Sequence, residues 1–253
     1  MTPEQLTKHF ASIGARAKYQ PARRETDLVF DIRTDDHGEH FLIRRGLKAP
    51  RLELLQKLPK DRHLLLYATD GHRYLCGHDE RHWFVADVDS PASTVQAAKR
   101  ALIPQAIRQQ IEGIHPEIID RRRNVVFHRQ GEWFFIPVHL EINPVLIMKN
   151  EPIQRDRRSK PHFCQELYRV GGQLVYFVRN GMTTTTLTDE EVEQKKAADP
   201  GFHRKIIRTM VRNPEMYARG TVRHPDHATI LLREWHRILL NAERVNDTIQ
   251  WFD

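Results

Sequence analysis

Residues 63–88 read HLLLYATDGHRYLCGHDERHWFVADV, and this stretch decides the fold that the sequence predicts. Three runs within it, 63–68, 73–76 and 82–88, are short and rich in apolar and aromatic residues. The dipeptide Asp70-Gly71 between the first two runs is typical of a hairpin turn, because glycine adopts positive φ without steric cost. The stretch therefore predicts an antiparallel meander.

Further elements are predicted on the N-terminal side of the meander. Thr2 suits a helix cap and Pro3 suits the first helical position, so we expect a helix at the N-terminus. The extended runs 28–32 and 40–43 flank a polar loop with a glycine near its end, which predicts a hairpin. The apolar positions of 52–58 fit a helical face and a short strand equally, so both structures stay open there.

A mid-chain helix is predicted over about residues 90–112. Ser90 would cap this helix, and Pro104 would kink it or end its first half, with a second piece running to Gly113, because proline lacks a backbone N–H. The arginine-rich stretch that follows marks a seam between an N-terminal half, 1–120, and a C-terminal half, 121–253. A single domain is the alternative, because no Ser/Gly-rich linker lies at the seam.

Two hairpins are predicted in the C-terminal half, over 124–138 and 166–178. In each of them alternating runs surround glycines, Gly131 in the first and Gly171-Gly172 in the second. The segment 149–163 between them is polar and contains prolines, which predicts a long loop.

One or two helices are predicted near 188–213, followed by strands over 218–240. Thr188 and Glu191 form a capping-box pattern for the first helix. After Pro200 the apolar residues at 206, 207, 210 and 211 fit one face of a second, basic helix. The whole pattern predicts an α+β fold with mostly antiparallel sheet.

The composition excludes several classes of protein. The chain has 253 residues, of which 40% are hydrophobic and 29% charged, and this excludes collagen-like, low-complexity and wholly disordered chains. No run reaches the roughly 18 consecutive apolar residues of a membrane span, and the N-terminus lacks a secretory-signal pattern. Two cysteines fit a reducing compartment. We therefore expect a cytoplasmic protein with no membrane partner.

The charge of the chain favours anionic partners. Forty Lys and Arg against 33 Asp and Glu give a net charge of +7, and the excess lies in 121–160 and 201–240. Guanidinium groups bind phosphate bidentately, so these segments predict a nucleic-acid interface for DNA or RNA. The residues expected there are Arg81, Arg121, Arg122, Arg123, Trp133 as a base-stacking ring, Arg155, Arg157, Arg158, Lys160, Arg204, Lys205, Arg208 and Arg212. A solvated basic surface is the alternative.

Histidine is abundant, with 15 copies, and one dense group of polar residues lies in the predicted turn 76–83. His78 or His82 would exchange a proton with a substrate there, while Asp79 or Glu80 orients the imidazole and Arg81 binds a phosphate or carboxylate. The alternative is an ordinary charged turn, because polar residues fill most turns.

A second group follows later in the chain and offers further candidate acids and bases. His224 and His227 flank Pro225 and Asp226, and His236 lies one predicted strand further on. Alternatively, His224, Asp226, His227 and His236 would bind a divalent metal such as zinc or manganese. Another alternative is a two-Cys, two-His zinc set made of Cys76, His78, His162 and Cys164, although its ligand spacing is tighter than usual.

These observations predict a nucleic-acid-binding protein, with phosphodiester hydrolysis by the histidines as an accompanying activity. Gly-rich phosphate loops, a serine nucleophile elbow and a dinucleotide fingerprint are absent from the sequence, which disfavours the common ATPase, hydrolase and Rossmann functions. Two alternatives stay open. One is an interaction module that docks an acidic protein, and the other is a metal-dependent hydrolase of a small anionic substrate.

Overall fold

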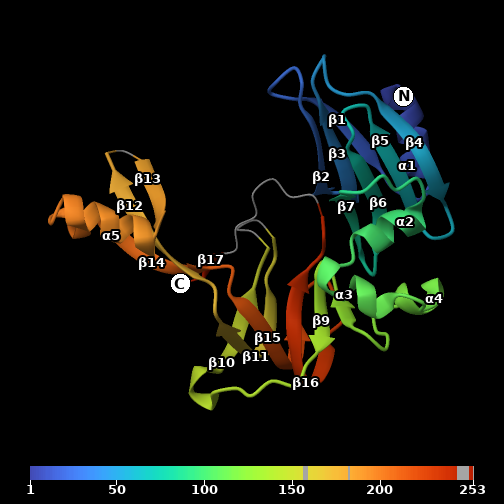
Figure 1. Ribbon diagram of the computed structural model, residues 1–253. Helices are drawn as coiled ribbons and strands as arrows, with labels where there is room; N and C mark the ends of the chain where they lie inside the picture. The colour runs from blue at the N-terminus through green and yellow to red at the C-terminus, as the bar shows by residue number, and fades with distance from the viewer. Residues whose placement is uncertain (156–158, 182, 244–250, 253) are drawn as a thin grey trace. The chain divides into compact units, whose positions relative to one another are not determined.

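The computed structural model describes residues 1–155, 159–181, 183–243 and 251–252 (Figure 1). It is mostly β, with 48% strand and 19% helix, and its strands form four sheets. The predicted α+β fold is therefore wrong, because the described helices are few and short. No described helix is both long and apolar enough to cross a membrane.

The described residues form two compact units. Unit 1 contains Met1–Phe134 together with Asp226–Ala228 and residues 240–243. Unit 2 contains the described parts of Phe135–Pro225 and of Thr229–Leu239, with residues 251–252. Each unit therefore takes residues from separate stretches of the chain.

The N-terminal helix and the first sheet of unit 1 follow the sequence pattern. Helix α1 (Pro3–Ser12) begins with a capping box in which the Thr2 hydroxyl accepts a hydrogen bond from the backbone N–H of Gln5, as its sequence predicts. The sheet has the order β1-β3-β2, made of β1 (Ala17–Pro21), β2 (Leu28–Asp35) and β3 (Gly38–Arg45). β2 and β3 form the predicted hairpin, and β1 pairs with β3 in parallel.

The predicted meander is confirmed as the second sheet of unit 1, with strands in sequence order. These strands are β4 (Leu52–Leu58), β5 (His63–Ala68), β6 (Arg73–Asp79) and β7 (His82–Asp87). A helix and a strand are both open for residues 52–58 by sequence, and the structure shows a strand. The core between α1 and these strands contains Phe10, Phe41, Leu64, Leu66, Cys76 and Trp83.

The mid-chain helix begins four residues later than its sequence predicts. α2 (Val95–Ala101) is capped by Thr94, whose hydroxyl accepts a hydrogen bond from the Ala97 N–H at 3.1 Å, and Ser90 lies outside the helix. The buried side chains of Val95 and Ala98 then pack on Leu65 and Leu75 of the meander, as well as on Val88 and Ala92. The position of this apolar face therefore determines that Thr94, and not Ser90, caps the helix.

Of the two outcomes predicted for the helix over 90–112, a kink or an end at Pro104, the structure shows an end. Pro104 ends the first piece and stands at the N-cap of α3 (Gln105–Arg108), which continues into the 3-10 turn η1 (Gln109–Ile111). A further short helix, α4 (Pro116–Ile119), follows. Proline therefore interrupts the helix completely instead of kinking it.

A six-stranded sheet, most of it in unit 2, has the order β10-β11-β15-β16-β9-β8. Its strands are β8 (His128–Gln130), β9 (Trp133–Pro137), β10 (Met148–Ile153), β11 (His162–Val170), β15 (Glu215–Arg223) and β16 (Ile230–Leu240), with the 3-10 turn η2 (Pro144–Leu146) before β10. The strand expected from residue 124 is thus only three residues long. The loop expected over 149–163 is wrong at both ends, because β10 and β11 extend into it.

A four-stranded sheet of unit 2 has the order β13-β12-β14-β17 (Figure 1). Its elements are β12 (Gln173–Asn180), β13 (Thr183–Thr188), the capped helix α5 (Asp189–Ala198), the 3-10 turn η3 (Phe202–Lys205), β14 (Ile206–Arg212) and β17 (Trp251–Phe252). The predicted hairpin around Gly171-Gly172 is wrong, because β11 and β12 pair in different sheets.

The second helix predicted near 188–213 is also wrong. Residues 206–212 form β14, which pairs antiparallel with β12 along its whole length. The apolar residues Ile206, Ile207, Met210 and Val211 fit a helical face by spacing alone. In the sheet, Met210 is instead buried opposite Val175, and Ile206 packs with α5.

Candidate functional site

The histidine-rich turn of unit 1 is a tight connection between β6 and β7. Asp79 and His82 are cross-strand partners, so only Glu80 and Arg81 form the turn. Glu80 has a φ of 47°, which is the left-handed region that costs a residue with a Cβ about 1–2 kcal/mol. A turn held in this conformation needs compensating contacts, and the Glu80 side chain makes them.

The Glu80 carboxylate binds the segment 226–228, which is distant in sequence but belongs to the same unit. Its Oε2 atom accepts a hydrogen bond from the Ala228 N–H at 2.9 Å and lies 3.4 Å from Nδ1 of His227. The Arg122 guanidinium pairs with both Glu80 and Asp79. One glutamate thus joins the β6–β7 turn, the arginine-rich stretch and the second histidine-rich segment.

His82 lies between two carboxylates. Its Nδ1 atom is 2.6 Å from Oε1 of Glu39, and its Nε2 atom is 3.4 Å from Oδ1 of Asp226. The other oxygen of Glu39 accepts a hydrogen bond from the Trp83 N–H at 2.9 Å. Both ring nitrogens therefore face carboxylates of this chain, which fixes the orientation of the imidazole.

These residues form one group, which we name the histidine–carboxylate cluster. Its members are Glu39, Asp79, Glu80, His82, Arg122, Arg129, Asp226 and His227. Burial lowers the pKa of His227, and Asp79 opposes this shift. Four carboxylates stand against two guanidinium groups, so the cluster is acidic and does not favour a phosphate ligand. It can relay protons between imidazole and carboxylate.

His78 and Arg81 of the first predicted group are not among the members of this cluster. His78 packs edge-on against Trp83, with ring centroids 4.9 Å apart, and burial together with Arg62 lowers its pKa. Arg81 is exposed at the turn. The sequence prediction named Asp79, Glu80, His82, Asp226 and His227, and it named Arg122 as a nucleic-acid-binding residue. It missed Glu39, whose only sequence signal is its place at the end of a predicted hairpin loop.

The other predicted histidines belong to unit 2. His236 is 3% exposed, its Nδ1 atom lies 2.7 Å from the Glu234 carbonyl oxygen, and burial lowers its pKa. His224 stacks on His162, with ring centroids 4.1 Å apart and an interplanar angle of 27°. The predicted set His224, Asp226, His227 and His236 is therefore divided between the two units.

Both cysteines are buried thiols. Burial raises the pKa of Cys164 to about 12 and raises the pKa of Cys76 even further. A thiol with such a pKa carries little thiolate at neutral pH, so neither cysteine is poised as a nucleophile. Cys76 belongs to unit 1 and Cys164 to unit 2.

The basic residues predicted to bind nucleic acid lie in different environments. Arg121, Arg123 and Lys160 are exposed, Arg155 is half-buried, and Arg122 is part of the histidine–carboxylate cluster. Arg157 and Arg158 lie outside the described residues. The Trp133 ring is 0% exposed, so it is not accessible to a base. Arg204 and Lys205 lie on η3, and Lys205 pairs with Asp199 at 3.1 Å.

One face of the β12–β13–β14 sheet gathers arginines around an aromatic ring. Tyr176 and its partner Leu187 pack with Val192 of α5, so α5 covers their face of the sheet. Since side chains alternate along a strand, Phe177 and its partner Arg208 lie on the opposite face. The Arg208 Cζ atom is 4.6 Å from the centre of the Phe177 ring.

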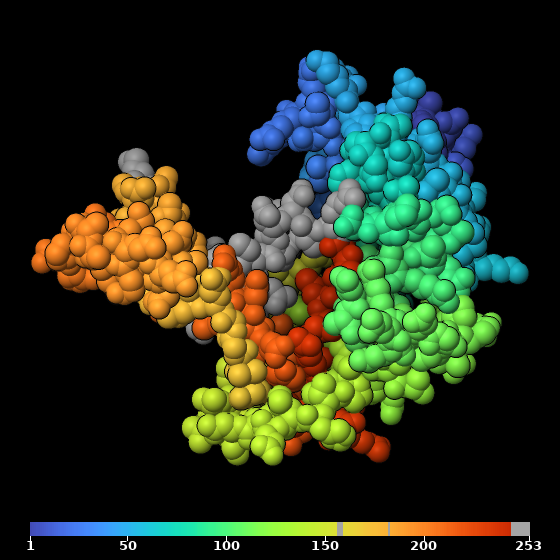
Figure 2. Space-filling model, in the orientation of Figure 1, coloured from blue at the N-terminus to red at the C-terminus, as the bar shows by residue number. Residues whose placement is uncertain are grey.

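We name this surface the arginine face. Its residues are Phe177, Arg179, Thr184, Thr186, Arg208 and Arg212, which are joined by cross-strand pairing or by alternation along β12 and β14. Arg179, Thr184, Thr186 and Arg208 are exposed, and Phe177 and Arg212 are half-buried. Figure 2 shows β12, β13 and α5, in orange shades, packed closely against one another.

Charge separates the two sides of this segment. The sequences of β12, β13 and β14 contain three arginines and no aspartate or glutamate. The first turn of α5, by contrast, carries Asp189, Glu190 and Glu191. The sheet side is therefore basic, and the helix side begins with acidic residues.

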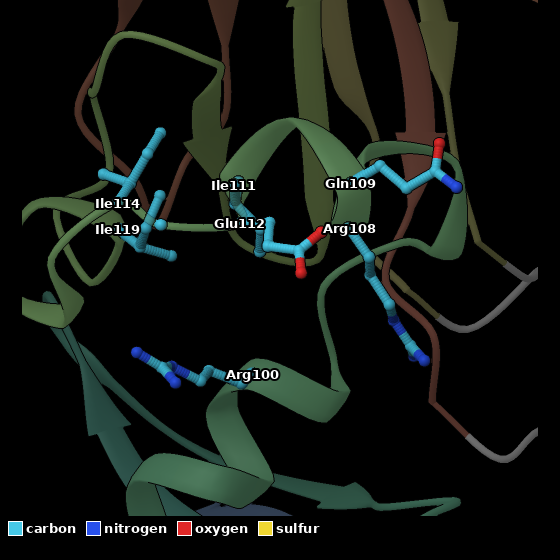
Figure 3. Close-up of a pocket in the computed structure, with 8 residues that line it drawn as sticks. Arg100, Arg108, Gln109, Ile111, Glu112, Ile114 and Ile119 are labelled. Atoms are coloured by element: carbon cyan, nitrogen blue, oxygen red, sulfur yellow. The ribbon is translucent and has the colours of Figure 1, made fainter.

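Two pockets lie apart from these groups. One, of about 360 Å³ in unit 1, places Arg100 across an open space from Ile114 and Ile119, with Glu112 on its lining (Figure 3). The other, of about 520 Å³ in unit 2, is lined by Trp235, Arg219 and neighbouring residues. The residues that line them include none of the histidines that the sequence analysis selected.

Searches of protein-family models, of curated proteins and of solved structures find no match to this chain.

Proposed function

We propose that this chain binds single-stranded nucleic acid on the arginine face of unit 2. The observation that carries the proposal is the Arg208 guanidinium over the Phe177 ring, on a sheet whose strands β12, β13 and β14 contain arginines and no aspartate or glutamate. A surface with this charge composition attracts phosphate.

The chemistry of the face suits an extended strand of nucleotides. Unstacked bases stack on aromatic rings and on guanidinium planes, and both are present at Phe177 and Arg208. Arg179 lies two residues from Phe177 on β12, and Arg212 lies opposite Gln173, on the far side of the buried pair Val175 and Met210. Both arginines would bind backbone phosphates. The hydroxyls of Thr184 and Thr186 can donate a hydrogen bond to a phosphate oxygen and can donate to or accept from a ribose hydroxyl.

The proposal is binding without phosphodiester cleavage. The histidine–carboxylate cluster has more carboxylates than guanidinium groups, and both nitrogens of His82 face carboxylates. A phosphodiester approaching it would meet repulsion. We therefore expect an oligonucleotide to remain intact during incubation with the protein.

The first prediction concerns Arg208. Fluorescence anisotropy with labelled single-stranded RNA and DNA should show binding that weakens as salt rises. Arg208→Gln should weaken binding and reduce the slope of log affinity against log salt by about 0.7, the value for one phosphate contact on a single strand. Phe177→Leu should weaken binding with an unchanged slope, because it removes stacking and not charge.

The matched control is Lys195→Gln, which removes an exposed charge from α5 on the other side of the same segment. It should leave both affinity and slope unchanged. Equal losses in Arg208→Gln and Lys195→Gln would contradict the assignment of the arginine face. Tighter binding of duplex than of single strands, or of polyglutamate than of either, would reject the proposal in favour of another anionic partner.

A further inference from the structure

Two histidines of unit 2 form a close pair at one end of the six-stranded sheet. The imidazole rings of His162 and His224 stack with centroids 4.1 Å apart, and ring nitrogens of the two lie within 4.8 Å of each other. His162 is 1% exposed and His224 is half-buried. Zinc binds an imidazole nitrogen at about 2.0–2.1 Å, so one ion can be shared by nitrogens up to about 4.2 Å apart, a separation inside this limit.

The register of the sheet produces this pair. Phe163 of β11 is the cross-strand partner of Arg223 of β15. His162 and His224 are the next residues beyond that last pair, and their rings stack. His162 also pairs with Ile153 of β10, which holds its backbone in the sheet.

We infer that His162 and His224 together bind one divalent transition-metal ion. Two imidazoles this close cannot both be protonated without repulsion, whereas a single metal ion attracts both nitrogens. The pair is preorganised, because His162 is buried in the sheet and Pro225 restricts the backbone just after His224. Binding therefore costs little side-chain entropy.

The ligand chemistry selects the class of metal. Neutral imidazoles suit zinc, copper and nickel, whereas magnesium and calcium prefer oxygen ligands. Two protein ligands leave coordination positions open for water or another small ligand, as in an exchangeable site.

The test is a metal titration of the full-length, tag-free protein after dialysis against a chelator and its removal. Isothermal titration with zinc should show one ion per chain, and copper should give an electron paramagnetic resonance spectrum with hyperfine coupling to two nitrogens. Lowering the pH from 7.5 to 5.5 should abolish zinc binding, because protonated imidazole does not bind metals (ordinary pKa about 6.5). Magnesium should give no heat above dilution.

His224→Ala and His162→Gln should each lose at least tenfold in zinc affinity. His203→Ala is the matched control, because His203 is an exposed histidine of the same unit; it should bind zinc as the unchanged chain does. Circular dichroism establishes that each variant is folded, and if His162→Gln is not, His224→Ala alone decides. Unchanged affinity in His224→Ala, or no zinc binding by the folded parent chain, would overturn the inference.

Discussion

At the scale of single residues, His63 makes the stability of unit 1 depend on pH. Its buried ring lies edge-on to Phe84, and its Nδ1 atom is 2.5 Å from the Asp61 carbonyl oxygen. Burial lowers its pKa from 6.5 to about 4. Between these values the unfolded chain binds the proton and the folded chain does not, so the free energy of unfolding rises with pH by about 3 kcal/mol in total from this group.

We therefore predict that unit 1 loses stability as the pH falls from 6.5 to 4, and that His63→Asn removes much of this loss. Pulse-labelling hydrogen exchange in urea, read on peptides from β5 and β6, measures the unfolding of this unit alone. The control is His37→Asn, which changes an exposed histidine of the β2–β3 turn and should keep the pH dependence of the parent chain. If His63→Asn also keeps the pH dependence of the parent chain, the prediction is wrong.

At the scale of elements, α2 shows how packing chooses a helix boundary. Thr94 accepts a hydrogen bond from the Ala97 N–H, and the Val95 N–H donates to the Gln56 side chain at 2.6 Å. Ser90 precedes a proline and has the sequence of a cap, yet the helix begins only where Val95 reaches the apolar core. Local capping signals are weaker than burial of an apolar face.

Two alanine substitutions test whether Thr94 or Ser90 caps α2. Thr94→Ala should lower the free energy of unfolding by about 1 kcal/mol, the usual contribution of a threonine cap. Ser90→Ala should change it by less than about 0.5 kcal/mol, as for a site outside such features. Hydrogen exchange of the α2 peptides in a series of urea concentrations measures both changes in the free energy of unfolding. An equal loss in the two variants would show that the helix is capped differently.

At the scale of the whole molecule, unit 1 includes residues from near the C-terminal end of the sequence. Glu80 binds Ala228 and His227, the Asp87 N–H donates to Glu243, and the Ala242 N–H donates to the Leu102 carbonyl. Unit 1 therefore combines Met1–Phe134 with residues 226–228 and 240–243, and both histidine-rich segments contribute to one cluster.

Glu80→Ala should weaken the contacts between the β6–β7 turn and residues 226–228. It removes the acceptor of the Ala228 N–H and the carboxylate beside His227 and Arg122, and the loss of hydrogen bonds to a charged group costs about 1.5–3 kcal/mol. Hydrogen exchange should accelerate in residues 226–228 and in the β6–β7 turn. Arg81→Ala, at the next turn position, should leave exchange unchanged; similar acceleration in both variants would contradict the role assigned to Glu80.

The sequence predicted correctly the elements whose cause is local. The meander over 63–88, the hairpin of β2 and β3, and the capped helices α1 and α5 depend on turn glycines, alternation and capping residues that are near one another in the chain. The composition also predicted a basic chain, and part of the expected basic set, Arg208 and Arg212, lies on the arginine face.

Only the tertiary structure decided which strands pair, and with them the sites. The spacing of residues 206–212 fits a helix and a strand alike, and pairing with β12 selected the strand. Gly171-Gly172 signals a turn, but not that its two strands enter different sheets. His162 meets His224 through the register of β11 with β15, some sixty residues apart. Such pairings depend on burial and hydrogen bonding over the whole sheet. A local sequence pattern does not contain this information.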